Sequence, residues 1–157
     1  MNPLKSCKLR TAGLASAKSA TFGMVRKNAD GTPRAHQGID LQADEGTAVY
    51  AIADGVIEGV NRAENGYGLT LTLKFWIDGK AYYAFYAHLD DVFVKAGQLV
   101  KDGGFLAITG DSGNAKGMTT IAKGGHLHIE IRETANVGIG LAGRLDPLKF
   151  IKLDKES

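Results

Sequence analysis

Two histidines lie two residues apart in a short segment whose pattern is typical of a β-strand. Alternation along a strand would place four polar side chains of residues 125–132 on one face, namely His126, His128, Glu130 and Arg132. The opposite face would carry Leu127, Ile129 and Ile131. Two neighbouring imidazoles on one sheet surface suit a metal ion, so this segment predicts part of a metal site.

A second pair of candidate ligands, His36 and Asp40, lies far upstream with Gly38 between them. Two histidines and one aspartate can hold zinc and leave the fourth position for water. In a regular strand the pair would be about 13 Å apart, at roughly 3.3 Å per residue, which is too far to share an ion. We therefore expect the chain to bend at Gly38, since glycine tolerates tight turns and disfavours a helix here.

The residues alone leave simpler interpretations open. His36 and Asp40 could hydrogen-bond only to each other, and the face that carries His126 and His128 could be the solvated side of a sheet. His88 follows a tyrosine-rich segment, so it could belong to an aromatic cluster in the core. The combination of all these segments in one chain favours a metal site over each of these simpler interpretations.

Composition describes the fold that must position these side chains. The 157 residues suffice for one domain, and 21 glycines against three prolines indicate many tight turns between short strands. No helical period persists, so we predict a mainly β fold, an antiparallel sheet arranged as a sandwich or open barrel. The formal charge of +2 does not support nucleic-acid binding.

Two hairpins are predicted from alternation and turn residues. The strongest joins residues 69–77 to residues 81–88 through Asp78 and Gly79. The other would join residues 47–53 to residues 56–60 through Asp54 and Gly55. Glycines between residues 97 and 117 then predict short extended pieces and a loop before the histidine-bearing strand.

The domain boundaries follow from where patterned sequence begins and ends. We expect residues 1–21 to form an extended lead-in, residues 22–152 the folded domain and residues 153–157 a tail. Cys7 would be a free thiol in a loose N-terminus without a functional role. Neither a membrane span nor the apolar core of a signal peptide is expected.

Read together, the motifs around His36, His88 and His126 resemble the signature of the lysostaphin-like zinc endopeptidases, which cut peptide cross-links in bacterial peptidoglycan. The matching segments are residues 36–40, 86–89, 126–130, 100–103, 110–113 and 145–148. The resemblance spans about residue 22 to residue 148 and implies the lysostaphin-like fold, of the duplicated hybrid motif type. Two departures, Ser112 where relatives often carry threonine and the long loop of residues 116–125, bear on substrate preference.

The resemblance also implies roles for individual residues. His36, Asp40 and His128 would bind Zn²⁺, while His126 would act as general base and His88 would stabilise developing charge. Such an ion lowers the pKa of bound water towards about 7 and polarises the scissile carbonyl. The implied partners are the peptide stems or cross-bridges of peptidoglycan.

Two further hypotheses accompany this interpretation. A non-catalytic wall-binding or amidase-activating module of the same fold is the alternative function, although such relatives usually lose ligands. Because no export signal is expected, we predict secretion by another route, as an antibacterial effector or lysin that acts in the periplasm or cell wall. An effector would add an immunity or carrier protein as a partner.

Overall fold

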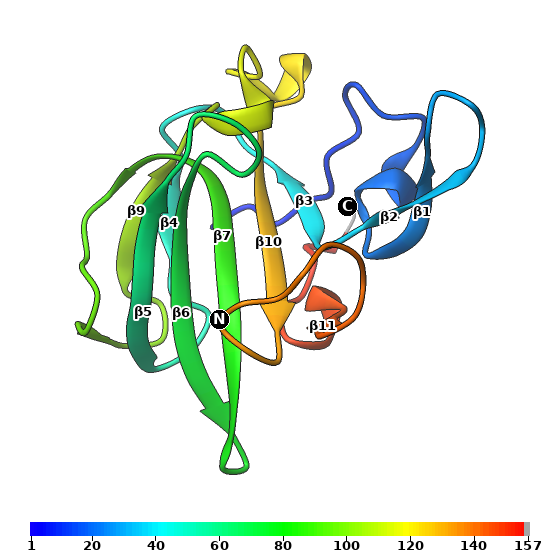
Figure 1. The fold of residues 1–157 in the computed structure, drawn as a ribbon. Coiled ribbons are helices and arrows are strands. Elements are labelled where there is room, and N and C mark those ends of the chain that lie inside the picture. Colours follow the sequence, from blue (N-terminus) through cyan, green and yellow to red (C-terminus); the bar gives the residue numbers. More distant parts are fainter. Residues whose placement is uncertain (156–157) are drawn as a thin grey trace.

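Antiparallel β-strands dominate residues 1–155, the part of the chain that the computed structural model describes (Figure 1). The strands are β1 (Gly23–Lys27), β2 (Pro33–His36), β3 (Ile39–Gln42), β4 (Ala48–Tyr50), β5 (Gly55–Arg62), β6 (Leu69–Ile77), β7 (Lys80–Val92), β8 (Leu99–Val100), β9 (Phe105–Thr109), β10 (His126–Arg132) and β11 (Arg144–Leu145). Short 3-10 helices lie between them: η1 (Ala17–Ala20), η2 (Gly113–Ala115), η3 (Ile121–Lys123) and η4 (Pro147–Lys149). The prediction of a mainly β, antiparallel fold is confirmed.

Nine of the described strands form one sheet, and the long strand β7 organises it. One edge of β7 pairs with β6 along most of its length, whereas the other pairs first with β10 and then with β9. Strands β3 and β11 continue the sheet beyond β10. The hairpin of β1 and β2 stands apart from this sheet, beside β3 (Figure 1).

The β6–β7 hairpin confirms the stronger of the two hairpin predictions. Its turn residues Asp78 and Gly79 both have positive φ, at 50° and 80°. These values are typical of a type I′ turn, whose twist matches that of the flanking strands.

The hairpin predicted for residues 47–60 is wrong. Strands β4 and β5 both form, but β4 pairs with β9, and β5 pairs with β6 and β8. The Asp54–Gly55 turn therefore carries the chain between different parts of the sheet. Local turn chemistry indicated a reversal correctly, but pairing with distant segments decided the partners.

The alternation predicted for β10 is present and fixes the site's orientation. Leu127, Ile129 and Ile131 are fully buried in the hydrophobic core, together with Leu71 and Leu73 of β6. The two histidines of β10 consequently face away from this core.

The N-terminal segment packs against the sheet. Bends, turns and the short helix η1 follow one another along residues 1–21, Leu4 and Cys7 belong to the core, and Leu9 bridges to Leu41 of β3. Cys7 is a free thiol, as expected, yet the prediction that it lies in a loose N-terminus is wrong, because its side chain is fully buried.

The other end of the chain meets this segment. The amide of Asp154 donates a hydrogen bond to the carbonyl of Cys7, at 2.9 Å. Of the predicted tail, residues 156 and 157 lie outside the described part of the chain. Across residues 1–155, we find no helix with the length and apolar character needed to cross a bilayer.

Candidate metal centre

The pairing of β3 with β10 brings Asp40 to the histidine-bearing strand. In this register Asp40 lies directly opposite His128, and Gln42 lies opposite His126. Directly opposed residues have Cβ atoms about 4.5–5.5 Å apart, so residues 88 positions apart in sequence become neighbours. His128 Nδ1 lies 2.9 Å from Asp40 Oδ1.

His36 lies beside them because the backbone bends between β2 and β3, as the spacing predicted. Gly38 lies in this bend, where an added Cβ atom would come within 2.8 Å of Glu130 Cγ and closer still to the carbonyl oxygen of Ile129. The requirement for glycine is therefore close backbone approach rather than an unusual φ. The bend places His36 Nε2 3.1 Å from Asp40 Oδ1.

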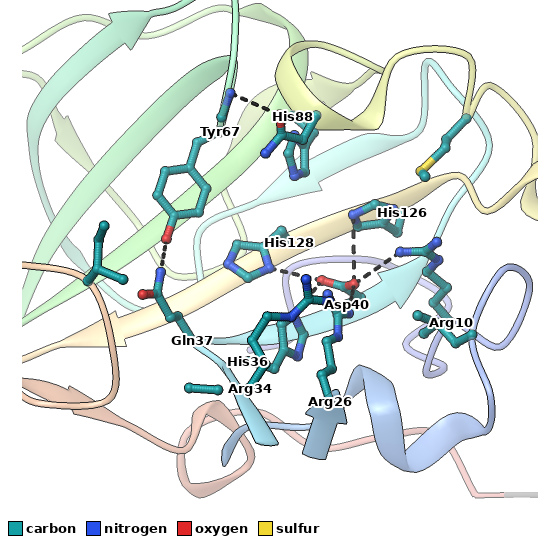
Figure 2. Close-up of a pocket in the computed structure, with 16 residues that line it drawn as sticks. Arg10, Arg26, Arg34, His36, Gln37, Asp40, Tyr67, His88, His126 and His128 are labelled. Carbon is teal, nitrogen blue, oxygen red and sulfur yellow. Dashed lines mark hydrogen bonds and ion pairs between the residues drawn. The ribbon is translucent and has the colours of Figure 1, made fainter. Parts of the chain in front are cut away.

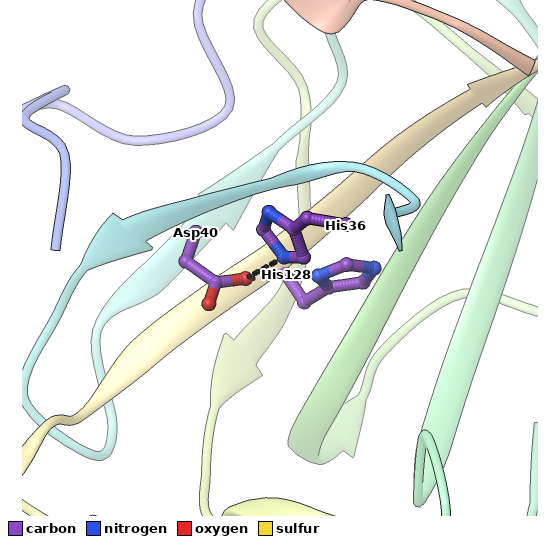
Figure 3. A group of neighbouring side chains, drawn as sticks. All are labelled: His36, Asp40 and His128. Carbon is purple, nitrogen blue, oxygen red and sulfur yellow. Dashed lines mark hydrogen bonds and ion pairs between the residues drawn. The ribbon is translucent and has the colours of Figure 1, made fainter. Parts of the chain in front are cut away.

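These three residues form a compact donor set (Figure 3). One donor atom from each of His36, Asp40 and His128 lies within 4.8 Å of the others, and all three side chains are buried. Two imidazole nitrogens and one carboxylate oxygen are ligands that zinc prefers. The residues that the resemblance implied are thus brought together, and the chemistry of their donors fits a zinc ion.

Both histidines in this set have their second ring nitrogen fixed by an acceptor. Nδ1 of His36 lies 2.9 Å from the carbonyl oxygen of Thr21, and Nε2 of His128 lies 2.8 Å from Glu130 Oε2. Such contacts orient both rings, so that Nε2 of His36 and, once it has lost its proton, Nδ1 of His128 can bind a metal. The fully buried carboxylate of Glu130 also accepts hydrogen bonds from Arg132 and Arg144, at 2.9 and 2.7 Å.

His126 and His88 border the donor set, and both use Nδ1 to contact the backbone. Nδ1 of His126 lies 2.8 Å from the carbonyl oxygen of Gly124, and Nδ1 of His88 lies 2.8 Å from that of Ser112. Their rings lie 5.1 Å apart between centroids. His126 Nε2 lies 3.8 Å from Asp40 Oδ2. Both residues therefore have Nε2 available within the site.

A β-bulge turns His88 towards the site. Opposite β6, the register shifts between Tyr86 and Leu89, both of which are fully buried in the core. His88 has a positive φ of 58°, which is rare outside glycine. Bulges often redirect a side chain near an active site. The open alternative that His88 joins a core aromatic cluster is excluded by this geometry.

The electrostatics of the ligands favour a charged pair in the metal-free protein. Burial opposes ionisation of Asp40, but hydrogen bonds from His128 and His36 keep its pKa well below the ordinary value. Burial alone would lower the pKa of His128, but hydrogen bonds to Asp40 and Glu130 raise it to about 9. At neutral pH both ring nitrogens of His128 are therefore protonated until a metal displaces the proton on Nδ1.

The two bordering histidines behave differently. Burial lowers the pKa of His88 to about 4, helped by repulsion from His126 and His128. Burial also lowers the pKa of His126, against the opposing effect of Asp40. Both rings are therefore neutral at pH 7, with an unprotonated Nε2 that can accept a proton.

Arginines from the N-terminal part of the chain complete the surroundings of Asp40. Arg10 Nη1 lies 3.3 Å and Arg26 Nη2 lies 2.8 Å from Oδ2, whereas His36 and His128 contact Oδ1. The carboxylate thus presents one oxygen to the metal ligands and the other to the arginines. Arg10 was not predicted as a site residue, because residues 1–21 were expected to form a lead-in, although the apolar residues Leu4, Cys7 and Leu9 were a signal of packing.

The site opens into a pocket of about 580 Å³ (Figure 2). Besides the four histidines and Asp40, its lining includes Arg34, Gln37, Tyr67 and Met118. Tyr67 stacks on the His128 ring at 5.5 Å between centroids, and its hydroxyl accepts a hydrogen bond from the side-chain amide of Gln37. No role was predicted for Tyr67 and Met118, because the loops that carry them show no periodic pattern.

Of the two departures noted in the sequence, Ser112 contacts the lining residue His88, and the loop of residues 116–125 supplies a lining residue of its own. Ser112 holds His88 through its carbonyl, and its hydroxyl donates to the carbonyl of Leu89, at 2.7 Å. The loop of residues 116–125 contains η3 and contributes Met118 to the lining. Ser112 therefore makes both of the contacts that hold His88 and its neighbour Leu89 in place.

Comparisons with curated proteins find similar sequences in a metalloprotease, a murein hydrolase activator and a peptidoglycan endopeptidase of bacteria. An uncharacterized metalloprotease of Haemophilus influenzae is 38% identical over 113 residues, which are 71% of this chain and 22% of that protein. The murein hydrolase activator NlpD of Escherichia coli is 32% identical over 71% of this chain and 27% of its own length. The peptidoglycan DD-endopeptidase ShyB of Vibrio cholerae is 33% identical over 61% and 20%. The chain thus spans about a quarter or less of these relatives.

Solved structures share the fold. A zinc-containing peptidase from Vibrio cholerae superposes with a TM-score of 0.65 at 26% identity, over 98% of this chain and 41% of that chain. The catalytic domain of lysostaphin from Staphylococcus simulans gives a TM-score of 0.64 at 26% identity, over 83% and 87%. The lysostaphin-like fold that the motifs implied is therefore confirmed. The family model of peptidase family M23 matches residues 34–138, which contain all four histidines and Asp40, and the chain belongs to this family.

Proposed function

We propose that this chain is a zinc-dependent endopeptidase that hydrolyses peptide cross-links of bacterial peptidoglycan. The observation that carries the proposal is the complete donor set of His36, Asp40 and His128, with the free Nε2 atoms of His126 and His88 beside it. Family membership and the peptidases among the similar proteins support the same reaction class.

His36 Nε2, Asp40 Oδ1 and His128 Nδ1 are the atoms that would hold the zinc ion. When bound, zinc would lower the pKa of a water molecule and polarise the scissile carbonyl. Glu130 supports this arrangement from behind, because its contact with His128 Nε2 keeps Nδ1 directed at Asp40. Arg10 and Arg26 hold the other carboxylate oxygen and so restrict rotation of Asp40.

His126 is suited to act as general base. Its Nδ1 proton is used on Gly124, so Nε2 is the basic atom, and its lowered pKa keeps Nε2 unprotonated at neutral pH. In the proposed reaction Nε2 takes a proton from the attacking water and later returns it to the leaving amine.

His88 would stabilise the negative charge that develops on the carbonyl oxygen. Its Nδ1 proton is used on Ser112, so Nε2 can donate a hydrogen bond only after it gains a second proton. We propose that His88 takes this proton from solvent as negative charge develops on the carbonyl oxygen, and returns it to solvent when the carbonyl group re-forms. The variant His88→Gln tests this role, because glutamine can donate an N–H hydrogen bond to the carbonyl oxygen but cannot act as a base.

The proposal is tested by incubating purified, zinc-loaded protein with intact peptidoglycan and measuring the released muropeptides by mass spectrometry. Loss of cross-linked dimers is expected with the wild type and with the control Lys123→Ala, which alters an exposed residue close to His126 in sequence. His126→Ala should reduce the rate at least about 100-fold, the usual contribution of a general base. Full activity in His126→Ala would exclude the assigned role.

A second candidate function is activation of a separate wall hydrolase, because the similar protein NlpD is a murein hydrolase activator. The intact donor set favours the endopeptidase, since an activator has no need of it. The same assay decides between them when a purified amidase is added. An activator would speed the amidase equally well after His126→Ala and release no peptide product alone.

We further propose that the protein acts in the periplasm or cell wall, where its substrate lies, and that it serves as an antibacterial effector or lysin. Producer cells should tolerate cytoplasmic expression but lyse when an export signal is attached to the chain. Survival after confirmed export of zinc-loaded protein would count against this role. Rescue by a co-expressed immunity or carrier protein would identify the predicted partner.

A further inference from the structure

Two arginines face each other across the hairpin that borders the metal centre. In the β1–β2 register, Arg26 lies directly opposite Arg34, and Arg34 is two residues from His36 on the same strand face. Like charges directly opposite one another destabilise a strand pair. Such a pair is therefore expected where an anion can lie between or beside the two side chains.

Asp40 provides this anion for only one of the two. Arg26 contacts Asp40 Oδ2 at 2.8 Å, and this oxygen is shared with Arg10. Arg34 is exposed, and we find no hydrogen bond or ion pair for its side chain within residues 1–155. Its guanidinium lacks a counter-ion in the described part of the chain.

The pocket as a whole is positively charged. Its described lining contains three arginines but Asp40 as the only acidic residue (Figure 2). A zinc ion would add two further positive charges. Glu130 does not offset this, because it lies behind His128 and is paired with Arg132 and Arg144.

We propose that Arg34, supported by Arg26, is a specificity residue that binds a carboxylate of the substrate next to the scissile bond. The guanidinium fork suits bidentate pairing with a carboxylate. The inference deepens the proposed function, on which it rests, by naming the substrate class: peptides with a free carboxylate near the cleaved bond, in preference to uncharged bridges such as polyglycine.

Matched peptides test the inference. Two synthetic peptides with the same sequence and the same scissile bond are compared, one with a free carboxylate beside that bond and one with a carboxamide. Their binding is measured by calorimetry with metal-free protein, so that direct coordination of the carboxylate by zinc cannot contribute. Cleavage of both is then measured with zinc-loaded protein.

Wild-type protein should prefer the carboxylate peptide by about 10- to 100-fold in both measurements, as expected for a charge-assisted hydrogen bond. Arg34→Gln should abolish the preference, and Arg34→Lys should retain part of it. The control Arg62→Gln, which removes an exposed arginine of β5, should retain all of it.

Equal binding of the two peptides by the wild type would overturn the inference, as would a preference that survives Arg34→Gln. An Arg34-dependent preference in binding without cleavage of either peptide would uphold the inference and contradict the proposed function. The two failures are therefore distinguishable.

Discussion

Replacing Gly38 with alanine should damage the metal centre without touching any ligand. Gly38 joins the strands that carry His36 and Asp40, and its backbone passes close to Ile129 of β10. An added Cβ atom would lie 2.8 Å from Glu130 Cγ and 3.0 Å from the carbonyl carbon of Ile129. Its φ is not in the left-handed region, so the cost is steric rather than conformational.

The size of the effect follows from these contacts. Restoring ordinary van der Waals separation requires β3 and β10 to move apart by on the order of 1 Å at this point, because interiors are close-packed. This shift would break the local hydrogen bonds between β3 and β10 and displace Asp40 from His128. Overpacking of this kind costs about 1–3 kcal/mol, and we expect about 3 because a rigid carbonyl is the obstacle.

Thermal unfolding and zinc titration measure both consequences. Gly38→Ala should lower Tm by about 6–12 °C, at about 2–4 °C per kcal/mol for a chain of this size. Zinc affinity should fall at least about 10-fold, the lower end of the loss seen when the supports of metal ligands are removed.

Gly59→Ala is the matched control, since a Cβ atom there would meet only Asn61 Nδ2, at 3.9 Å. This variant should bind zinc normally and be as stable as the wild type or slightly more stable. Wild-type stability and zinc affinity in Gly38→Ala would refute the argument that close approach at this residue builds the site.

Three further predictions concern protons and reactivity. Zinc binding at pH 7.5 should release about one proton, since the raised pKa of His128 keeps it protonated without metal; calorimetry in two buffers of different ionisation enthalpy measures this, and identical heats would contradict it. Metal-free protein should lose up to about 3 kcal/mol of stability as the pH falls from 6.5 to 4, because His88 in the unfolded chain becomes protonated at a higher pH than in the folded protein. Denaturant unfolding of His88→Asn should show a smaller loss over the same pH range. A loss equal to that of the wild type would exclude His88 as the cause. Cys7, whose pKa burial raises to about 12, should react with a thiol reagent only after unfolding, and rapid labelling of native protein would contradict its burial.

The sequence predicted those parts of the site that depend on local pattern. Strict alternation in residues 126–132 placed both histidines of β10 on one face, because the opposite face is needed for the core. The distance argument also predicted the bend at Gly38. The β6–β7 hairpin followed from Asp78 and Gly79, whose positive φ values suit a tight turn.

Non-local pairing decided what the pattern could not predict. The Asp54–Gly55 turn did not reveal that β4 pairs with β9, a strand more than 50 residues later. The orientation of His88 depends on a bulge between β6 and β7, and simple alternation would have placed it in the core with Tyr86.

The contacts of the N-terminal segment were the largest part of the site that the sequence did not predict. Its sequence lacks a strand period, so only a lead-in was predicted there. In the folded protein Arg10 contacts Asp40, and the carbonyl of Lys8 accepts a hydrogen bond from Gln42 of β3, at 2.8 Å. The segment extends the edge of β3, and its role depends on a partner strand that local sequence does not specify.

The most direct test of the zinc endopeptidase proposal compares peptidoglycan digestion by metal-free and zinc-reconstituted protein, with muropeptides identified by mass spectrometry. We predict no cleavage without metal, restoration by one equivalent of zinc, and loss of that restoration in Asp40→Ala. Each cut should add one water to a cross-link and leave new amino and carboxyl ends. Cross-links that stay intact with fully zinc-loaded wild-type protein, or that are cut equally well by Asp40→Ala, would contradict the account.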